Sequence, residues 1–373
     1  MKYKLSDCVE IISGGTPKKA VSEYWDGNIP WITIKDFGSK YPKSTDNYIT
    51  QEGLNHSAAK LSKDKDILIS ARGTVGEVMM VHSGYTFNQS IYGLRIKEKV
   101  AIPEYIYYWL LANKQIFIKN VHGSVFDTIT RKIFDHIQIE LPCIANQAEI
   151  VSKLNSIDSK IALNELINDN LLELAKTIFK NIIRTSSLHA LTINDVGTVI
   201  GGGTPSKKVS KYWNGNIPWI SPKDLSNHPN VFTSRGENSI TQNGLDNSST
   251  KLLPQKTVLF SSRAPIGYIS IANNEITTNQ GFKSVIPDKN YPFWFIYELL
   301  KSETPKIINE ANGSTFKEIS GSKLKQHTIS IPTSVEVMKY NSVFLPIFEK
   351  IQQSEEEIDK LNQIKNILLN KFF

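Results

Sequence analysis

The chain contains one distinctive stretch twice. Residues 14–32 read GGTPKKAVSEYWDGNIPWI and residues 202–220 read GGTPSKKVSKYWNGNIPWI, so 15 of 19 positions are identical at an offset of 188. This spacing is far longer than the period of a solenoid repeat, so each copy is expected to be a whole domain. The duplication therefore limits the chain to folds in which one domain is built twice.

Shorter motifs extend the repeat beyond this stretch. The sequence ITQ at 49–51 returns at 240–242, SARGTVG at 70–76 returns as SSRAPIG at 261–267, and NQ at 88–89 returns at 279–280. The sequence GSVF at 123–126 returns as GSTF at 313–316 and is expected to form a loop that could touch nucleic acid. Each copy runs into a long segment with almost no Gly or Pro, which predicts the order domain, helix, domain, helix with the boundaries 1–142, 143–185, 186–332 and 333–373.

Each domain has the pattern of a mixed α/β fold with α+β character. Short β-rich runs at 31–34, 67–70, 78–81 and 92–96 are separated by Gly, Asn, Asp and Lys turns. Pro103 opens a predicted helix that reaches about Asn120, and an apolar run at 133–141 closes the domain. The second copy repeats this order, with the matching helix at 292–310.

The two long segments carry matching heptad patterns. Their apolar residues alternate in steps of four and three, with polar Asn164 and Asn168 in the middle of the first. Each helix could pack on its own domain, but a length of roughly 60 Å at about 1.5 Å per residue favours antiparallel pairing of the two helices with approximate two-fold symmetry. Pro346 is expected to start or kink the second helix. The residues predicted to pair are Ile150, Leu154, Ile157, Ile161, Leu171, Ile178, Tyr340, Phe344, Ile347, Ile351, Ile358, Leu361 and Leu368.

Several repeated loops have the chemistry of a polyanion site. Glycine N–H groups next to lysines can hold a phosphate, although a tight turn with solvated lysines has the same sequence. An arginine at a strand end suits a bidentate contact to phosphate or guanine, or an internal salt bridge. The Asn-Gln pairs could contact base edges or satisfy buried backbone groups, with the structural role favoured. The candidate DNA-binding residues are Lys18, Lys19, Lys35, Arg72, Thr74, Asn88, Gln89, Lys207, Lys208, Lys223, Arg263, Asn279 and Gln280.

Other features restrict the function. A formal net charge of +7 permits a polyanionic partner without requiring one. Two cysteines without a CxxC pair fit a reducing compartment, and no apolar run is long enough for a signal peptide or a membrane span, so a soluble cytoplasmic protein is expected. The His residues lack metal-ligand spacing, and no catalytic motif is duplicated, so the chain is not expected to be an enzyme. The repeated NIPW sequences are expected to be structural, with the Trp in a core.

The doubled GGTP…NIPWI segments, the SARGTVG loop and the two helices resemble the specificity subunit of type I restriction-modification systems. The resemblance covers essentially the whole chain, although Lys18 stands where the family more often has Ser, as at Ser206. It implies two target-recognition domains that each read half of a split double-stranded DNA site, joined by an antiparallel coiled-coil spacer. It also implies separate methyltransferase and restriction subunits, which would bind S-adenosylmethionine, ATP and Mg²⁺, with no cofactor in this chain.

The residues agree with that implication on their own terms. Retained motifs would position the DNA backbone, whereas the segments 41–48 and 227–237, which differ between the copies, are candidates for reading bases. Two rival functions are a duplicated protein–protein adaptor without DNA specificity and a stand-alone methyltransferase that binds S-adenosylmethionine itself. Salt-dependent DNA binding would separate the first rival from a DNA-reading subunit, because phosphate contacts release counterions.

Overall fold

The computed structural model describes residues 1–121, 128–313 and 317–373. The predicted loop 123–126 and residues 314–316 of its counterpart lie outside the described residues. The chain divides into two units, one made of Met1–Ile161 and Lys360–Phe373 and the other of Ala162–Asp359, here called unit 1 and unit 2. Each unit thus holds one domain and a segment of both long helices. The predicted boundaries at 142, 185 and 332 remain predictions, because these units divide the helices instead of separating them from the domains.

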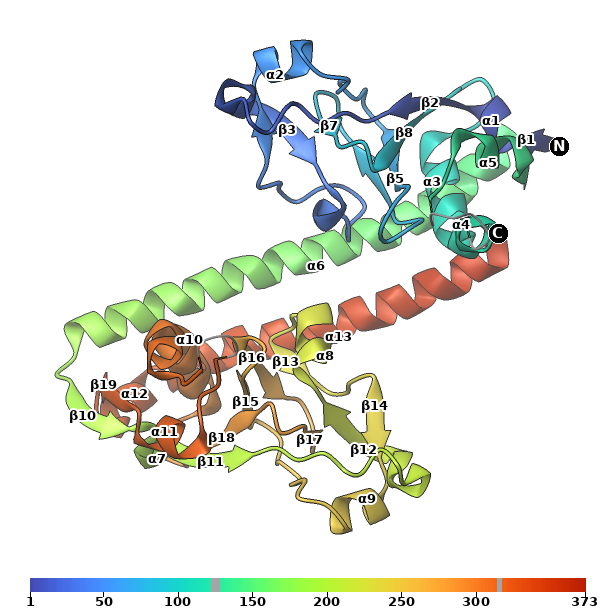
Figure 1. Ribbon diagram of the computed structural model, residues 1–373. Coiled ribbons are helices and arrows are strands. Elements are labelled where there is room, and N and C mark those ends of the chain that lie inside the picture. Colours follow the sequence, from blue (N-terminus) through green and yellow to red (C-terminus); the bar gives the residue numbers. More distant parts are fainter. Residues whose placement is uncertain (122–127, 314–316) are drawn as a thin grey trace. The chain divides into compact units, whose positions relative to one another are not determined.

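Unit 1 is built on two small sheets (Figure 1). The larger is antiparallel, with the strand order β2 (Val9–Ser13), β8 (Ile91–Ile96), β5 (Asp66–Ser70) and β6 (Val78–Val81). The smaller has the order β4 (Tyr48–Ile49), β3 (Trp25–Ile32) and β7 (Thr86–Phe87), and β1 (Lys2–Lys4) pairs with β9 (Gln138–Glu140). The helical segments are α1 (Leu5–Cys8), η1 (Ser22–Tyr24), η2 (Ile34–Asp36), α2 (Gln51–Asn55), α3 (Pro103–Ala112), α4 (Lys114–Val121) and α5 (Arg131–His136).

The larger sheet of unit 1 is buried on both faces. Every residue of β5 and β6 is buried, which explains the apolar runs at 67–69 and 78–81, and the polar residues Asp66 and Ser70 at the ends of β5 are buried too. On one face, Ile67 and Ile69 pack with α3, and Val151 and Leu154 of α6 (Ile144–Thr185) join the same cluster. On the other face, alternate residues of the same strands pack toward β3 and β7. The alternation of a strand thus builds two cores from one apolar run.

Unit 2 repeats this architecture. Its larger sheet has the order β11 (Gly197–Gly201), β18 (Lys283–Pro287), β15 (Val258–Ser262), β16 (Ile266–Ala272) and β13 (Phe232–Thr233). The smaller has the order β14 (Asn238–Ile240), β12 (Trp213–Ile220) and β17 (Thr277–Thr278), and β10 (His189–Thr192) pairs with β19 (Thr328–Ile331). The helical segments are α7 (Ile193–Val196), η3 (Ser210–Tyr212), α8 (Pro222–Asn227), α9 (Gln242–Asp246), α10 (Phe293–Glu310), α11 (Gly321–Gln326) and α12 (Ser334–Lys339).

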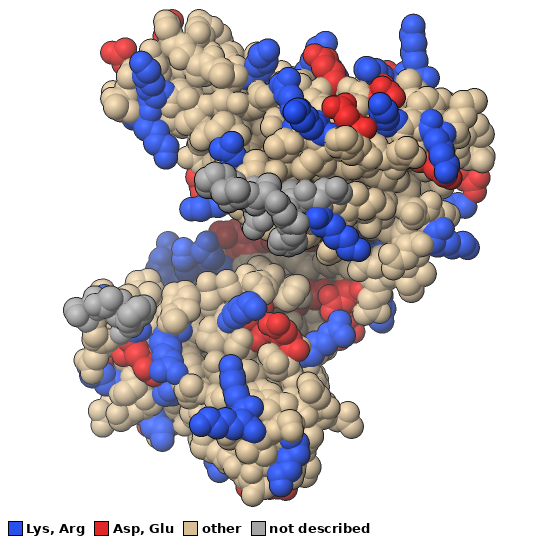
Figure 2. Space-filling view, turned by 45° about the vertical axis from the view of Figure 1, so that its right-hand side comes forward, with Lys and Arg blue, Asp and Glu red and all other residues tan. Residues whose placement is uncertain are grey.

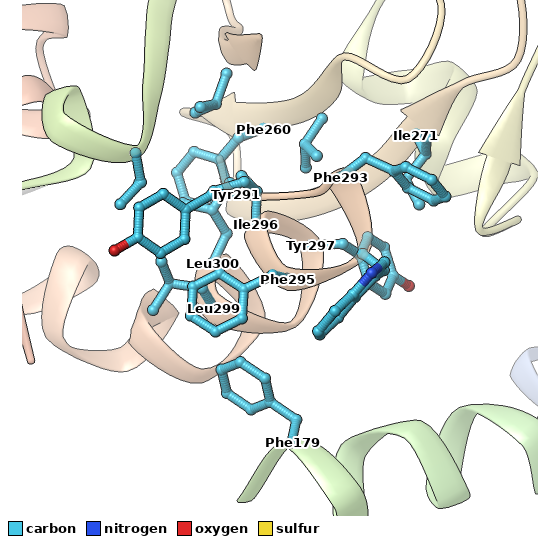
Figure 3. Close-up of a cluster of buried hydrophobic side chains, with 14 of the residues drawn as sticks. Phe179, Phe260, Ile271, Tyr291, Phe293, Phe295, Ile296, Tyr297, Leu299 and Leu300 are labelled. Atoms are coloured by element: carbon cyan, nitrogen blue, oxygen red, sulfur yellow. The ribbon is translucent and has the colours of Figure 1, made fainter. Parts of the chain in front are cut away.

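The main core of unit 2 is aromatic and joins α10 to the long helices. Figure 3 shows Phe179 of α6 near Phe295 of α10, and their ring centroids are 5.5 Å apart. Trp294 of α10 stacks on Phe344 of α13 (Asn341–Phe372) with centroids 3.9 Å apart and donates from Nε1 to Asn341 Oδ1 at 2.9 Å. These contacts hold both helix segments of unit 2 against its domain.

The two long helices also pack on each other within each unit, and they do so antiparallel. In unit 1, Lys365 Nζ lies 2.6 Å from Asp158 Oδ1, and Lys153 lies over the ring of Phe372. In unit 2, Asn164 Nδ2 donates to Glu357 Oε2 at 2.7 Å. Residue numbers on α13 therefore rise as those on α6 fall. The predicted antiparallel pairing is confirmed. The alternative also holds, because each helix packs on a domain as well.

The predicted pairing residues divide by burial. The four buried residues are Leu154, Phe344, Ile347 and Ile351. Five are partly buried against the two main cores, namely Ile150, Leu171, Ile178, Tyr340 and Leu368. The remaining four are partly exposed, namely Ile157, Ile161, Ile358 and Leu361.

Two helices differ from the sequence prediction. The helix expected from Pro103 to Asn120 breaks at Asn113, whose side-chain Nδ2 donates to Trp109 O at 3.0 Å. The apolar run at 133–141, for which no element was predicted, contains the end of α5 and then β9. Helix α13 begins at Asn341, so Pro346 does not start it; the proline lies inside the helix near its N-terminus.

Candidate nucleic-acid interface

The paired glycines of the GGTP loops are needed for close packing. The N–H groups of Gly14 and Gly15 donate to Ile91 O at 3.3 Å and Phe87 O at 2.9 Å. A Cβ on Gly15 would lie 2.1 Å from Ala59 N, which no side chain tolerates. The glycines of the second copy are held in the same way, by Phe282 O and Thr278 O. These N–H groups are therefore used inside the domain and are not the phosphate cradle that the sequence suggested.

The tryptophans of the NIPW sequences hold the GGTP loops by a hydrogen bond from the side chain. Trp31 and Trp219 are both buried, and their Nε1 groups donate to Gly15 O and Gly203 O, each at 2.9 Å. The structural interpretation of these sequences is confirmed. The lysines that follow the glycines are exposed in both copies, namely Lys18, Lys19, Lys207 and Lys208.

The Asn-Gln pairs separate into a structural residue and an exposed one. Asn88 Oδ1 accepts from the N–H of Ser90 at 2.9 Å, and Asn279 repeats this bond with Gly281 at 2.8 Å. The exposed Gln89 accepts from the hydroxyl of Thr16 through Oε1, as Gln280 does from Thr204. The asparagine thus shapes the turn, while the glutamine links it to the GGTP loop and keeps its amide N–H donors for other partners.

The four repeated loops converge at one end of each domain. In unit 1, the turn at residues 87–90 is bonded to the other three loops, because Gly15 N–H donates to Phe87 O, Asn88 N–H to Ile32 O at 3.0 Å, and Ala71 N–H to Ser90 O at 2.7 Å. Unit 2 has the corresponding bonds at 2.9, 2.8 and 2.7 Å. The candidate side chains carried on or directly after these loops are Lys18, Lys19, Lys35, Arg72, Thr74 and Gln89 in unit 1, and Lys207, Lys208, Lys223, Arg263 and Gln280 in unit 2.

The two arginines of these loops differ in their surroundings. Arg263 Nη1 lies 3.3 Å from Glu318 Oε2, so the internal salt bridge that the sequence left open exists in unit 2. Arg72 is exposed and has no ion-pair partner among the residues that the structure describes. The glycine that ends each loop has a positive φ, +82° at Gly76 and +102° at Gly267, which explains why it is kept in both copies.

One basic position was missed because the two copies supply it from different elements. Arg131 at the start of α5 donates from Nη2 to Ser13 Oγ at 2.8 Å, at the end of β2. Its counterpart at an offset of 190 is Gly321, and there Lys283 of β18 lies nearby, 3.6 Å from where a Cβ on Gly321 would be. Burial lowers the pKa of Lys283, with Glu318 opposing the shift. A search for compensating basic residues at neighbouring positions could have found this pair.

Charge at the surface is mixed. Lys and Arg side chains are spread over the face shown in Figure 2, with Asp and Glu among them. No large single-signed field covers that face, so attraction of a polyanion would depend on particular side chains at the converging loops. Lys223 illustrates the local mixing, since its Nζ lies 3.1 Å from Glu237 Oε2.

The divergent segments differ in structure, and each passes the strand that leads into one of these loops: Thr45 Oγ1 donates to Trp31 O at 3.3 Å, and a Cβ on Gly236 would lie 2.9 Å from Trp219 O. Residues 41–48 reach β4 without a regular element, whereas residues 227–237 end α8, form β13 and then turn back toward β14. In unit 2 a polar cavity of about 450 Å³ is lined by this segment together with Lys223 and Asp359. The two segments thus differ in structure as well as in sequence, and their role in reading bases stays a prediction.

Two negative findings hold for the described part of the chain. No three His, Cys, Asp or Glu residues are placed together to hold a metal ion. No helix there is both long enough and apolar enough to cross a bilayer.

Comparison with known proteins gives a consistent result. The chain matches the family described as "Type I restriction modification DNA specificity domain" over residues 1–173 and again over 189–366. The MjaIX specificity subunit of Methanocaldococcus jannaschii is 40% identical over 183 residues, which are 48% of this chain and 42% of that subunit. The EcoR124I/EcoR124II specificity subunit of Escherichia coli is 29% identical over 247 residues, 61% of this chain and 59% of that subunit. The matches thus span about half the length of these two relatives.

A solved structure shares the fold. The type I restriction-modification system S subunit from M. genitalium superposes with a TM-score of 0.60 at 15% identity, covering 100% of this chain and 96% of that one. Since the family match covers both domains and most of both long helices, the chain belongs to the type I restriction-modification DNA specificity family.

Proposed function

We propose that this chain is the non-catalytic recognition subunit of a type I restriction-modification complex. It reads a bipartite, asymmetric DNA site, with one half-site for each domain, and docks methyltransferase and restriction subunits. The observation that carries the proposal is the convergence of the same four loops at one end of both domains, in a chain whose segments 41–48 and 227–237 differ between the copies. Retained loops suit sequence-independent backbone contacts, and divergent segments suit base readout.

The proposal assigns roles to the converging side chains. The exposed lysines contact phosphates, the arginines contact phosphate or a guanine edge, and Gln89 and Gln280 offer amide donors to a base edge or the backbone. Segments 41–48 and 227–237 read the bases of the two half-sites. Methyl transfer and cleavage belong to the partner subunits, which bind S-adenosylmethionine, ATP and Mg²⁺ in this scheme.

Salt-dependent, sequence-selective DNA binding by the full chain with its methyltransferase partner tests the proposal. Binding should weaken steeply between low and physiological salt, because each phosphate contact releases counterions. Methylated positions in host DNA should define one split site. A chain that binds partner proteins but no DNA would instead be the adaptor considered above.

Arg72→Ala is expected to weaken DNA binding by about 1–3 kcal/mol, because Arg72 is exposed and forms no ion pair with the described residues, which suits a direct contact with DNA. The measurement is a titration of labelled duplex at several salt concentrations. Lys99→Ala is the matched control, since this exposed lysine follows β8 at the opposite end of the sheet from Arg72. Equal affinity of the wild type and Arg72→Ala, with the fold intact, would remove Arg72 from the interface.

Replacing residues 188–332 with the equivalent domain of a relative is expected to change one half-site and leave the other unchanged. The reason is that each domain has its own sheet, core and set of converging loops. Methylome sequencing of cells that carry the hybrid measures both halves at once. A change in both half-sites would contradict independent reading.

A further inference from the structure

In unit 2 the divergent segment is held by a carboxylate of the long helix α13. Glu355 is buried, with 9% of its surface exposed, and accepts hydrogen bonds from the main-chain N–H groups of Val231 and Phe232 at 2.7 and 2.9 Å. Phe232 begins β13, in the middle of the segment 227–237. The helix thus binds the backbone of this segment, and these two hydrogen bonds do not involve its variable side chains.

The other side of the same segment is fixed by the sheet. Ile271 N–H donates to Val231 O at 2.7 Å, and the hydroxyl of Ser270 donates to the same oxygen at 3.0 Å. The hydroxyls of Thr233 and Ser270 lie 2.6 Å apart. Residues 231–233 of the segment therefore lie between β16 and α13, and hydrogen bonds attach them to both.

Burying the Glu355 carboxylate costs free energy of desolvation. Desolvation raises the pKa of Glu355 to about 7, against the two N–H bonds that lower it. An apolar side chain of similar size would avoid the desolvation, but it would leave two N–H groups unsatisfied. The carboxylate is explained by the segment that it holds.

Unit 1 holds the corresponding segment with the opposite chemistry. Lys40 occupies the place of Val231, because Met80 N–H donates to Lys40 O at 2.7 Å just as Ile271 does to Val231. The Lys40 ammonium reaches into α6, where it contacts Asn155 Oδ1, lies 3.8 Å from Asp158 Oδ2, and lies 3.0 Å from the hydroxyl of Tyr108 in α3. The side chains of Lys40 and Asp158 are only 15% and 12% exposed.

We propose that Glu355 in unit 2, and Asn155 with Asp158 acting through Lys40 in unit 1, are positioning residues for the two base-reading segments. Both contacts attach to the same point of the fold, which is Val231 inside the divergent segment of unit 2 and Lys40 directly before the divergent segment of unit 1. The inference rests on the proposed function, in which these segments read DNA. Its consequence is that half-site specificity depends on helix residues that lie outside the domains.

The test compares the DNA sequences that full-length variants select from a random-sequence duplex library. Glu355→Ala should retain the first half-site and lose discrimination at the second by about tenfold per position. Lys40→Met, which keeps the side-chain length without the charge, should do the reverse. Glu349→Ala is the control. Glu349 lies on α13 within two turns of Glu355, but its side chain is exposed.

A second measurement does not depend on DNA. Hydrogen exchange in peptides that cover 228–237 should be faster by about tenfold or more in Glu355→Ala and unchanged in Glu349→Ala, because two N–H acceptors are lost. Glu355→Gln, which keeps one acceptor and the volume, should fall between the wild type and Glu355→Ala.

The outcomes are distinguishable. If Glu355→Ala and Lys40→Met both select the wild-type sequence, or if each loosens both half-sites equally, the positioning role is overturned. Unchanged exchange in 228–237 also overturns it. A wild-type chain that selects no sequence overturns the proposed function itself.

Discussion

A fragment that ends at Thr185 is expected to form a two-fold homodimer and, with the methyltransferase partner, to direct methylation to an inverted repeat of the first half-site. The fragment retains one domain and all of α6 but none of α13. Burying its bare apolar stripe is favourable by about 25 cal/mol per Å² of apolar surface. A two-fold dimer presents two identical domains, which maps onto a palindromic site.

The helix of a second fragment suits this role because the two long helices repeat each other at an offset of 190. In the full chain Asn168 and Ser354 are both buried, and Asn168 Oδ1 has no hydrogen-bond partner among the described residues. In an antiparallel homodimer with the same register, Asn164 of one copy would lie opposite Asn168 of the other. Their amides could then pair, which would favour this register over others.

The same comparison identifies what the homodimer lacks. Ala175 stands at the position of Lys365, so the ion pair of Lys365 with Asp158 would be lost. Ala175→Lys in the fragment should therefore restore the ion pair of Asp158 with the partner helix and strengthen the dimer, whereas Thr177→Lys, at an exposed position nearby, should not. Light scattering on the fragments and methylome sequencing in cells are the measurements. A monomeric fragment at micromolar concentration that still directs methylation of the original asymmetric site would refute the proposed pairing.

The sequence predicted the repeated domains well because their strongest signals are local. Strands β5 and β6 are short apolar runs bounded by turn residues, and both were found within a residue of their ends. The end of α3 was missed, since Asn113 bonds back to the last turn, while Glu303 at the matching position lets α10 continue. Asparagine is only weakly unfavourable inside a helix, so such an ending depends on the surrounding packing.

The sequence predicted which residues belong to the candidate site but not that their loops meet at one end of each domain. The loops that carry Lys18, Arg72 and Gln89 meet only through strand registers and backbone bonds that join residues far apart in the sequence. The contacts of Glu355 and Lys40 with the divergent segments are also invisible to pattern, because they cross more than a hundred residues and use opposite charges in the two copies. Comparing the two copies identifies the residues that they share. It does not identify Glu355 and Lys40, because the two copies hold the same part of the fold with different residues.

The free energy of unfolding of unit 2 is expected to decrease as the pH rises from about 4.5 to above 7, through Glu355. Its pKa in the folded chain, about 7, lies above its ordinary value of 4.5, because burial disfavours the charged form. Below 4.5 the carboxyl is protonated in both states, so its contribution to stability is fully present. Between these values only the unfolded chain releases the proton, and stability falls by about 1.4 kcal/mol per pH unit, up to about 3 kcal/mol.

Comparing the wild type with Glu355→Gln isolates this effect from other buried acids. Burial also raises the pKa of Glu298, which therefore adds a slope of the same sign in both proteins. Asp359 raises the pKa of Glu355 further, so Asp359→Asn should shift the transition to lower pH without removing it. Urea unfolding at a series of pH values gives the difference in free energy between the two proteins, which should change across pH 5–8 and be flat above it. Parallel pH profiles would mean that Glu355 ionises normally in the folded chain, and that the two N–H bonds from the divergent segment offset its burial.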